Sequence, residues 1–234
     1  TYVEDAAALT ELLCEKFNVG KVVVAAHSWG TIVGMPLVLE HPERIAAYIA
    51  QGVFVSGREN EDESYRFCLD EAKRRGDNRA IKRLSGIRPV NGKYPNDKAM
   101  KIQRDYLSRY GGGVWKGKKG LFASILTPLI RSGEYSWKQI FDYASGALYL
   151  SKTLWDDAVA ADYTSVTELK VPVIVTQGAH DYNTPTSLAK AWFDRLDAPF
   201  KKWIEFSESA HSPINEESEK WGKEVSEALS EAGI

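Results

Sequence analysis

The chain has 234 residues, a formal net charge of −2 and 44% hydrophobic residues, which is enough to bury the core of one domain with an insertion. Lysines and arginines are scattered among acidic residues, so the sequence has no basic field of the kind that binds nucleic acid or anionic lipid. No apolar run reaches the length of a membrane span, and residues 1–17 are typical of an amphipathic helix and not of a signal peptide. We therefore expect neither nucleic acid nor a membrane as a partner.

The two cysteines, Cys14 and Cys68, lie in helix-like sequence without the spacing of metal ligands. This usage predicts two reduced thiols and not a disulfide framework. A reducing compartment, the cytoplasm, is the location that it favours.

The two ends of the chain alternate helical and strand patterns. The N-terminal block predicts a helix over 3–17, a strand over 21–26, a helix over 31–41 and a strand over 45–55. The C-terminal block predicts a strand over 171–177, a helix over 187–196, a strand over 201–206 and a helix over 218–232. This alternation predicts an α/β fold, with a mostly parallel sheet and helices on both faces.

The middle of the chain, residues 56–167, lacks such strands and contains several helical patterns, over 64–75, 97–110, 120–131 and 135–148. It predicts a helical insertion, or cap, over one edge of a sheet formed by residues 1–55 and 168–234. Within it, the stretch GGGVWKGKKG, residues 111–120, is typical of a flexible, solvated loop, which we favour over a phosphate site.

The stretch AHSWG places Ser28 where a buried strand ends and a helix begins. A tight strand-turn-helix needs small residues two positions before and after its centre, and Ala26 and Gly30 meet that need. The spacing is that of the G-x-S-x-G nucleophile elbow, with alanine in place of the first glycine. Such an elbow exposes Ser28 Oγ and makes the backbone N–H of Trp29 an oxyanion donor. The alternative is that Ser28 only caps the helix.

A serine hydroxyl needs a base and an orienting carboxylate to act as a nucleophile at neutral pH. In folds with a serine elbow, the catalytic acid comes later in the chain, after a further strand, and the catalytic histidine comes last. Asp181 follows the strand VPVIVTQ, and His211 follows the strand KKWIEF. Both strand-end loops are predicted to lie on the same rim of the sheet as Ser28.

Other residues compete for these roles. His27 lies inside the elbow, where its side chain is expected to point away from the serine oxygen and to pack. His41 precedes a proline at a helix end, and His180 is adjacent to Asp181. Asp157 is a rival carboxylate, and Asp181 has the alternative role of capping the next helix. The strand-end positions favour Asp181 and His211.

With these motifs the chain resembles the α/β-hydrolase superfamily and, within it, the proline iminopeptidase-like serine hydrolases. The segment AHSWGTIVGMPLVLEHPERIAAYIAQGVF is similar to the elbow, helix and following strand of that group, and GAHDYNTP and SAHSPINEE resemble its acid and histidine loops. The resemblance covers roughly 3–55 and 169–229, and the middle corresponds only in kind to the helical cap of the group. It implies that Ser28 is the nucleophile, His211 the general base and Asp181 its orienting partner, with no metal or organic cofactor.

The resemblance does not include the N-terminal strands and the oxyanion loop of that group. Relatives begin with several further strands and an HGGPG-like loop, which supplies the second oxyanion N–H, a donor worth about 2.7 to 4 kcal/mol. Nothing similar precedes the helix over 3–17, and the strand over 21–26 would then expose an unpaired edge. We therefore expect the sequence to be the C-terminal portion of a longer chain, with a separate N-terminal fragment of the same protein as a partner.

The cap suggests the substrate class. Aminopeptidases of this group hold the substrate ammonium with cap carboxylates and its apolar ring with aromatic side chains. The cap offers Glu134 close to Trp137, and Trp155 before Asp156 and Asp157. The resemblance implies a short peptide or small molecule bound by Glu134, Trp137 and Trp155. The alternative is that the carboxylate is solvated and that the aromatic side chains only pack in the core. The resemblance leaves open a serine aminopeptidase, an esterase or amidase for small substrates, and an inactive, hydrolase-like binding protein.

Overall fold

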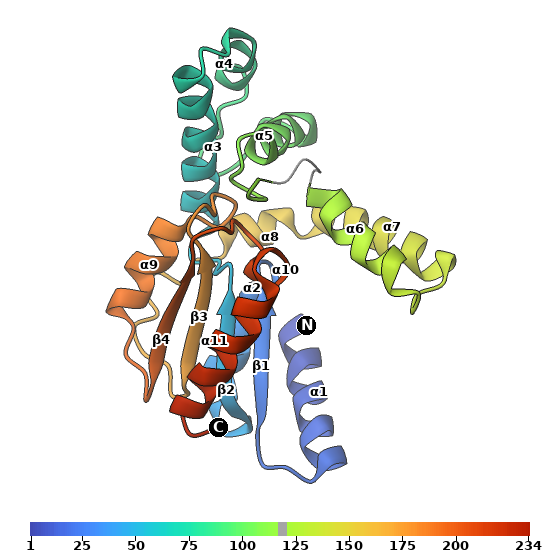
Figure 1. Ribbon diagram of the computed structural model, residues 1–234, viewed down its shortest axis with the longest axis vertical. Helices are drawn as coiled ribbons and strands as arrows, with labels where there is room; N and C mark the ends of the chain where they lie inside the picture. Colours follow the sequence, from blue (N-terminus) through green and yellow to red (C-terminus); the bar gives the residue numbers. More distant parts are fainter. Residues whose placement is uncertain (117–120) are drawn as a thin grey trace.

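A computed structural model describes residues 1–116 and 121–234, and its core is a four-stranded parallel sheet (Figure 1). The strands are β1 (Val22–His27), β2 (Ile45–Gln51), β3 (Val173–Gly178) and β4 (Lys201–Phe206), and they lie side by side in chain order. The predicted strands are found within a few residues. The second one is shorter than predicted, because the backbone turns at Gly52, where φ is 55°.

Helices cover both faces of the sheet, as predicted. On one face α2 (Gly30–Glu40) and α9 (Thr186–Arg195) pack on the strands, and on the other face lies α11 (Ser218–Glu231). Side chains of a strand alternate between the two faces, so Tyr48 and Ala50 of β2 belong to the first core and Ile49 to the second. The N-terminal helix α1 (Tyr2–Phe17) packs beside α2 and β1 (Figure 1).

Strand β1 has one open edge in the described part of the chain, because β2 is its one strand neighbour there. Its residues alternate between half-buried and exposed, and Val23 is 38% exposed. An open, apolar edge agrees with the expectation from the sequence. The pairing of this edge with a strand from outside residues 1–234 stays a prediction.

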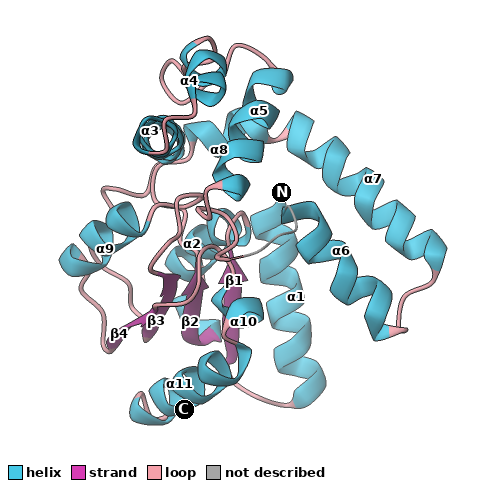
Figure 2. Cartoon of the chain, turned by 45° about the horizontal axis from the view of Figure 1, so that its top comes forward, coloured by secondary structure: helices cyan, strands magenta, loops and turns pink. Residues whose placement is uncertain are grey.

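The helices between β2 and β3 form the cap. They are α3 (Gly57–Arg74), α4 (Asn78–Ser85), α5 (Asp97–Arg109), α6 (Leu121–Ser132), α7 (Trp137–Thr153) and α8 (Trp155–Ala160). Figures 1 and 2 show that they lie beyond the carboxyl ends of the strands, with the α6–α7 hairpin extending away from the sheet on the side of β1 and α1. A separate core forms between α3, α4 and α5 around residues such as Cys68, Leu84 and Leu107.

Short helices were missed by the sequence analysis. These are α4, α8, the 3₁₀ turn Pro42–Arg44 and α10 (Pro213–Glu216), which span too few residues to show a helical period. Cys14 and Cys68 are both buried and unbridged. Among the helices of the described residues, none combines the length and the apolarity that a bilayer crossing needs.

Candidate active site

The backbone at Ser28 has the conformation of a nucleophile elbow. Its φ of 55° lies in the left-handed region that residues other than glycine rarely adopt. The Ser28 N–H donates to the Gln51 carbonyl at 2.9 Å, and the Ser28 carbonyl accepts the N–H of Thr31 at 2.8 Å and its hydroxyl at 2.6 Å. Helix α2 has no side-chain cap, so the alternative role of Ser28 as a helix cap is not what the structure shows.

The small residues around the elbow have unequal importance. A Cβ added at Gly30 would lie 3.9 Å from the Ala26 Cβ, which is an ordinary contact. At Gly34, one turn later, it would lie 2.9 Å from Tyr48 Oη and 3.1 Å from the Ala26 Cβ. The close approach of helix to strand is therefore at Gly34, a residue that the motif does not include.

The structure brings Ser28, His211 and Asp181 together. His211 Nε2 lies 2.7 Å from Ser28 Oγ, and His211 Nδ1 lies 2.9 Å from Asp181 Oδ2. His211 and Asp181 are 2% and 1% exposed. The loops that carry them follow β4 and β3, so they meet Ser28 at the carboxyl edge of the sheet. Asp157, the rival acid, is exposed on α8.

Both oxygens of Asp181 accept several hydrogen bonds. Oδ1 accepts the backbone N–H groups of Asn183 at 2.8 Å and Thr184 at 2.9 Å, and Oδ2 accepts the Thr184 hydroxyl at 2.8 Å and Gln177 Nε2 at 3.0 Å. Because a carboxylate oxygen only accepts, His211 Nδ1 carries the proton that faces Asp181. The lone pair of His211 Nε2 is then directed at the Ser28 hydroxyl.

Gln177 and Thr184 were not identified from the sequence. Gln177 is fully buried, and it also donates from Nε2 to the Thr184 carbonyl at 2.9 Å and accepts the Val53 N–H at Oε1, 3.2 Å away. It thereby ties the loop after β2 to the loop that carries Asp181. The one signal in the sequence is a polar side chain at the end of the apolar strand VPVIVTQ.

His27 contacts the histidine loop. Its Nε2 lies 2.8 Å from the His211 carbonyl oxygen, and the two ring centroids are 4.9 Å apart. Although part of the side chain is exposed, desolvation of the ring lowers the pKa of His27 to about 4, with a further contribution from the charge of His211. His27 is therefore neutral at pH 7 and donates its Nε2–H to that carbonyl. As expected, it does not contact Ser28 Oγ.

Trp29 supplies a backbone N–H beside Ser28, immediately before α2 begins at Gly30. Within the described ranges, no protein acceptor takes this N–H. A free N–H at the start of a helix has the direction and partial positive charge to bind a developing oxyanion. The Trp29 ring packs edge-on against Tyr2, with centroids 5.5 Å apart.

The cap residues predicted to bind substrate are placed differently. Glu134 is exposed in the turn between α6 and α7, and Trp137 is 74% exposed at the start of α7. Figure 2 shows this end of the α6–α7 hairpin far from the sheet. Trp155 is half-buried, with the Arg104 guanidinium 5.5 Å from its ring centroid. The structure thus brings the serine, acid, histidine and Trp29 N–H together, but it does not bring Glu134 and Trp137 to them.

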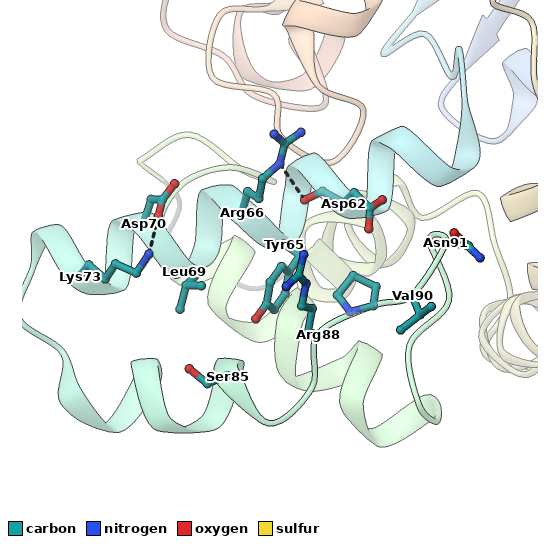
Figure 3. A pocket seen from close by; sticks show the side chains of 11 residues that line it. Asp62, Tyr65, Arg66, Leu69, Asp70, Lys73, Ser85, Arg88, Val90 and Asn91 are labelled. Carbon is teal, nitrogen blue, oxygen red and sulfur yellow. Dashed lines mark hydrogen bonds and ion pairs between the residues drawn. The ribbon is translucent and has the colours of Figure 1, made fainter.

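A groove of about 1020 Å³ lies in the cap between α3, α4 and the loop after α4 (Figure 3). Its lining includes Asp62, Arg66 and an Asp70–Lys73 ion pair of 3.0 Å. Neither the serine nor the acid and histidine that contact each other at the carboxyl edge of the sheet line this groove. Its size alone gives no reason to place a reaction there. Across residues 1–116 and 121–234, no three His, Cys, Asp or Glu side chains are grouped so that they could hold a metal ion.

Comparison with known proteins identifies the family of the chain. The family model described as alpha/beta hydrolase fold matches residues 1–217. The chain belongs to the α/β-hydrolase family. This α/β hydrolase is 26% identical to the probable aminopeptidase YbaC of Bacillus subtilis (strain 168) over 219 residues, which are 92% of this chain and 67% of YbaC.

Further similarities include one to a curated relative and one to a solved structure. Over 62 residues, 26% of this chain and 20% of the relative, the α/β hydrolase is 44% identical to a proline iminopeptidase of Clostridioides difficile (strain 630). A solved alpha/beta fold family hydrolase from Bacillus anthracis str. Sterne superposes with a TM-score of 0.54 at 16% identity, covering 98% of this chain and 73% of that one. The fold and the resemblance read from the sequence are confirmed, and the protein is a hydrolase.

Proposed function

We propose that this hydrolase uses Ser28, His211 and Asp181 as a catalytic triad and proceeds through an acyl-enzyme. The supporting observation is the pair of contacts on His211, 2.7 Å to Ser28 Oγ and 2.9 Å to Asp181 Oδ2. A histidine with an acceptor nitrogen toward a strained serine and a donor nitrogen toward a buried carboxylate has the arrangement that serine hydrolysis requires.

In the acylation step, Ser28 Oγ attacks the substrate carbonyl carbon while its proton moves to His211 Nε2. The carbonyl oxygen becomes an oxyanion that the Trp29 N–H stabilises. Asp181 stabilises the imidazolium without taking its proton. The tetrahedral intermediate collapses when His211 passes the proton to the leaving amine or alcohol, which leaves the acyl group on Ser28.

In the deacylation step, a water molecule takes the place of the leaving group. His211 Nε2 accepts a proton from this water, whose oxygen attacks the acyl carbon. The second tetrahedral intermediate collapses when His211 passes this proton to Ser28 Oγ, which breaks the bond between Oγ and the acyl carbon and releases a carboxylic acid. Ser28, His211 and Asp181 are then in their starting states.

For the substrate we propose a short peptide cleaved after its first residue, as in a proline iminopeptidase, or a small ester or amide. The aminopeptidase class is supported by the similarity to YbaC and to the C. difficile protein. The ammonium-binding role expected for Glu134, with Trp137 and Trp155 against the apolar ring, is not part of this proposal, because Glu134 and Trp137 are exposed at the α6–α7 turn. Glu134→Gln should therefore leave KM unchanged both for a prolyl p-nitroanilide and for p-nitrophenyl acetate. A KM about tenfold higher for the anilide alone would place Glu134 at the substrate.

The triad is tested with a fluorophosphonate, which forms a covalent bond with an activated serine. One adduct on Ser28, absent in Ser28→Ala and in His211→Ala, is the expected result, with turnover lost in both variants. Ser28→Ala removes one oxygen atom from a half-buried position, so its unfolding curve should match that of the unchanged protein. Hydrolysis by a folded Ser28→Ala would disprove the mechanism. No adduct on the unchanged protein would favour the alternative, a hydrolase-like binding protein.

A further inference from the structure

The segment Gly112–Lys116 lies between α5 and α6 in the chain, and its sequence is typical of a solvated loop. In the structure Gly112 and Gly113 are buried, because the segment lies on the two loops that carry Asp181 and His211. We infer that this segment positions both loops and thereby aligns the Ser28–His211–Asp181 contacts. This inference rests on the proposed triad.

The first set of contacts holds the acid loop on both sides of Asp181. After Asp181, the Tyr182 N–H donates to the Gly112 carbonyl at 2.9 Å. Before Asp181, the His180 ring is stacked on the Trp115 ring, with centroids 3.3 Å apart and planes 3° from parallel. The two neighbours of the acid are therefore both fixed by one short segment of the cap.

The second set holds the histidine loop. The His211 N–H donates to the Gly113 carbonyl at 3.3 Å. The Trp115 N–H donates to Glu216 Oε1 at 2.6 Å, and Glu216 Oε2 accepts the N–H groups of Ala210 at 3.0 Å and Ser212 at 3.1 Å. The backbone N–H groups of residues 210–212 are thus all held in place, the central one by the Gly113 carbonyl and the other two by the Glu216 carboxylate, which the segment binds.

The segment is tightly packed at Gly112. A Cβ there would lie 2.6 Å from Leu107 Cδ1, 2.7 Å from Phe67 Cε1 and 3.1 Å from the Tyr182 Cβ. Phe67 of α3 is itself stacked on Tyr182, with centroids 3.8 Å apart. The cap core and the acid loop therefore enclose Gly112 from both sides, which fixes where its carbonyl points.

None of these contacts reaches Ser28 or the Trp29 N–H, so Trp115 is a positioning residue. Displacement of a reacting group by about 1 Å lowers rates by about 100-fold. Loss of the Trp115 ring, which holds the acid loop through His180, should therefore slow attack by Ser28 and leave substrate binding unchanged. The alignment of the triad depends, by this inference, on the cap being seated on the sheet.

The experiment compares the second-order rate of fluorophosphonate labelling of Ser28 in the unchanged protein, Trp115→Ala and Trp115→Phe. The labelling rate reports the reactivity of Ser28 without a requirement for the natural substrate. We expect Trp115→Ala to react about 10- to 100-fold more slowly, and Trp115→Phe, which keeps a ring on His180, to recover most of the rate. The low-field NMR signal of the proton between His211 and Asp181 should shift in Trp115→Ala alone.

Phe17→Ala is the matched control, because Phe17 is 63% exposed at the end of α1 and should label at the unchanged rate. If Trp115→Ala does not fold, Glu216→Gln replaces it, with the same slowing expected. Unchanged labelling in a folded Trp115→Ala or Glu216→Gln would overturn this inference while the triad stands. Absence of labelling in the unchanged protein would overturn the triad itself, and this inference with it.

Discussion

The replacement of Gln177 by glutamate should make the stability of the protein depend steeply on pH. In the structure Gln177 Nε2 donates to Asp181 Oδ2 at 3.0 Å and to the Thr184 carbonyl at 2.9 Å. Gln177→Glu keeps the shape of the side chain but replaces the Nε2 donor with an oxygen, which faces the acceptor oxygens of Asp181 and Thr184. In the folded protein the new carboxyl group is therefore favoured in its protonated, neutral form, which can donate one hydrogen bond.

The size of the effect follows from the distance. Two unit charges 3.0 Å apart repel by about 5 kcal/mol at an effective dielectric constant of about 20, which corresponds to about four pKa units. Glutamate in the unfolded chain has a pKa of about 4.3, so the folded-state pKa of the new group is raised far above that value. The two carboxyl groups then titrate as a coupled pair.

The sign of the pH dependence is fixed by this shift. A raised folded-state pKa means that the folded variant binds a proton that the unfolded chain releases above about pH 4.3. The free energy of unfolding of the variant should therefore be closest to that of the unchanged protein near pH 4. The deficit should grow to about 5 kcal/mol as the pH rises toward 8.

Urea unfolding of both proteins at several pH values between 4 and 8 measures this difference, because titrations common to both proteins cancel. Gln103→Glu is the matched control: Gln103 is equally buried, but its Oε1 accepts from Arg104 and its Nε2 donates to the Ser64 hydroxyl at 2.8 Å. A charged glutamate there meets the Arg104 guanidinium, which also pairs with Glu61 at 2.6 Å, and a hydroxyl that can reverse direction, so a weaker pH dependence is expected than for Gln177→Glu. A difference for Gln177→Glu that stays constant from pH 4 to 8 would refute the reasoning.

Other replacements test further parts of the site. A Cβ at Gly178 would lie 1.9 Å from the Ala210 carbonyl oxygen, so Gly178→Ala should lower the free energy of unfolding by about 3 kcal/mol or more and abolish labelling of the serine. Gly222→Ala, in α11 with no atom within 4 Å of the added Cβ, should instead raise it by about 0.5 to 1 kcal/mol. The pKa of His27 is lowered to about 4, so between about pH 6.5 and 4 the unfolded chain takes up a proton that the folded chain does not, and stability falls as the pH falls. His27→Gln should lose less stability over that window in urea unfolding, and an equal loss in both proteins would contradict the assignment.

The sequence by itself determined the α/β fold and the order of its strands and helices. Periodicity is a local property, so the apolar runs before Ser28, Asp181 and His211 identified strands without knowledge of their neighbours. Because the carboxyl ends of parallel strands share one edge of a sheet, three strand-end loops had to lie near one another. The 2.7 Å and 2.9 Å contacts of His211 with Ser28 and Asp181 agree with that argument.

Tertiary packing decided what surrounds these residues. The donors that Gln177 and Thr184 give to Asp181 depend on how one loop folds over the end of its strand, which no spacing in the sequence encodes. The same holds for Gly112, whose tight packing comes from side chains on α3, α5 and the acid loop. The direction of the α6–α7 hairpin likewise left Glu134 exposed, because the angle between two helices depends on side chains distant in the chain. Contacts between distant segments, and not local propensity, set the geometry around the serine.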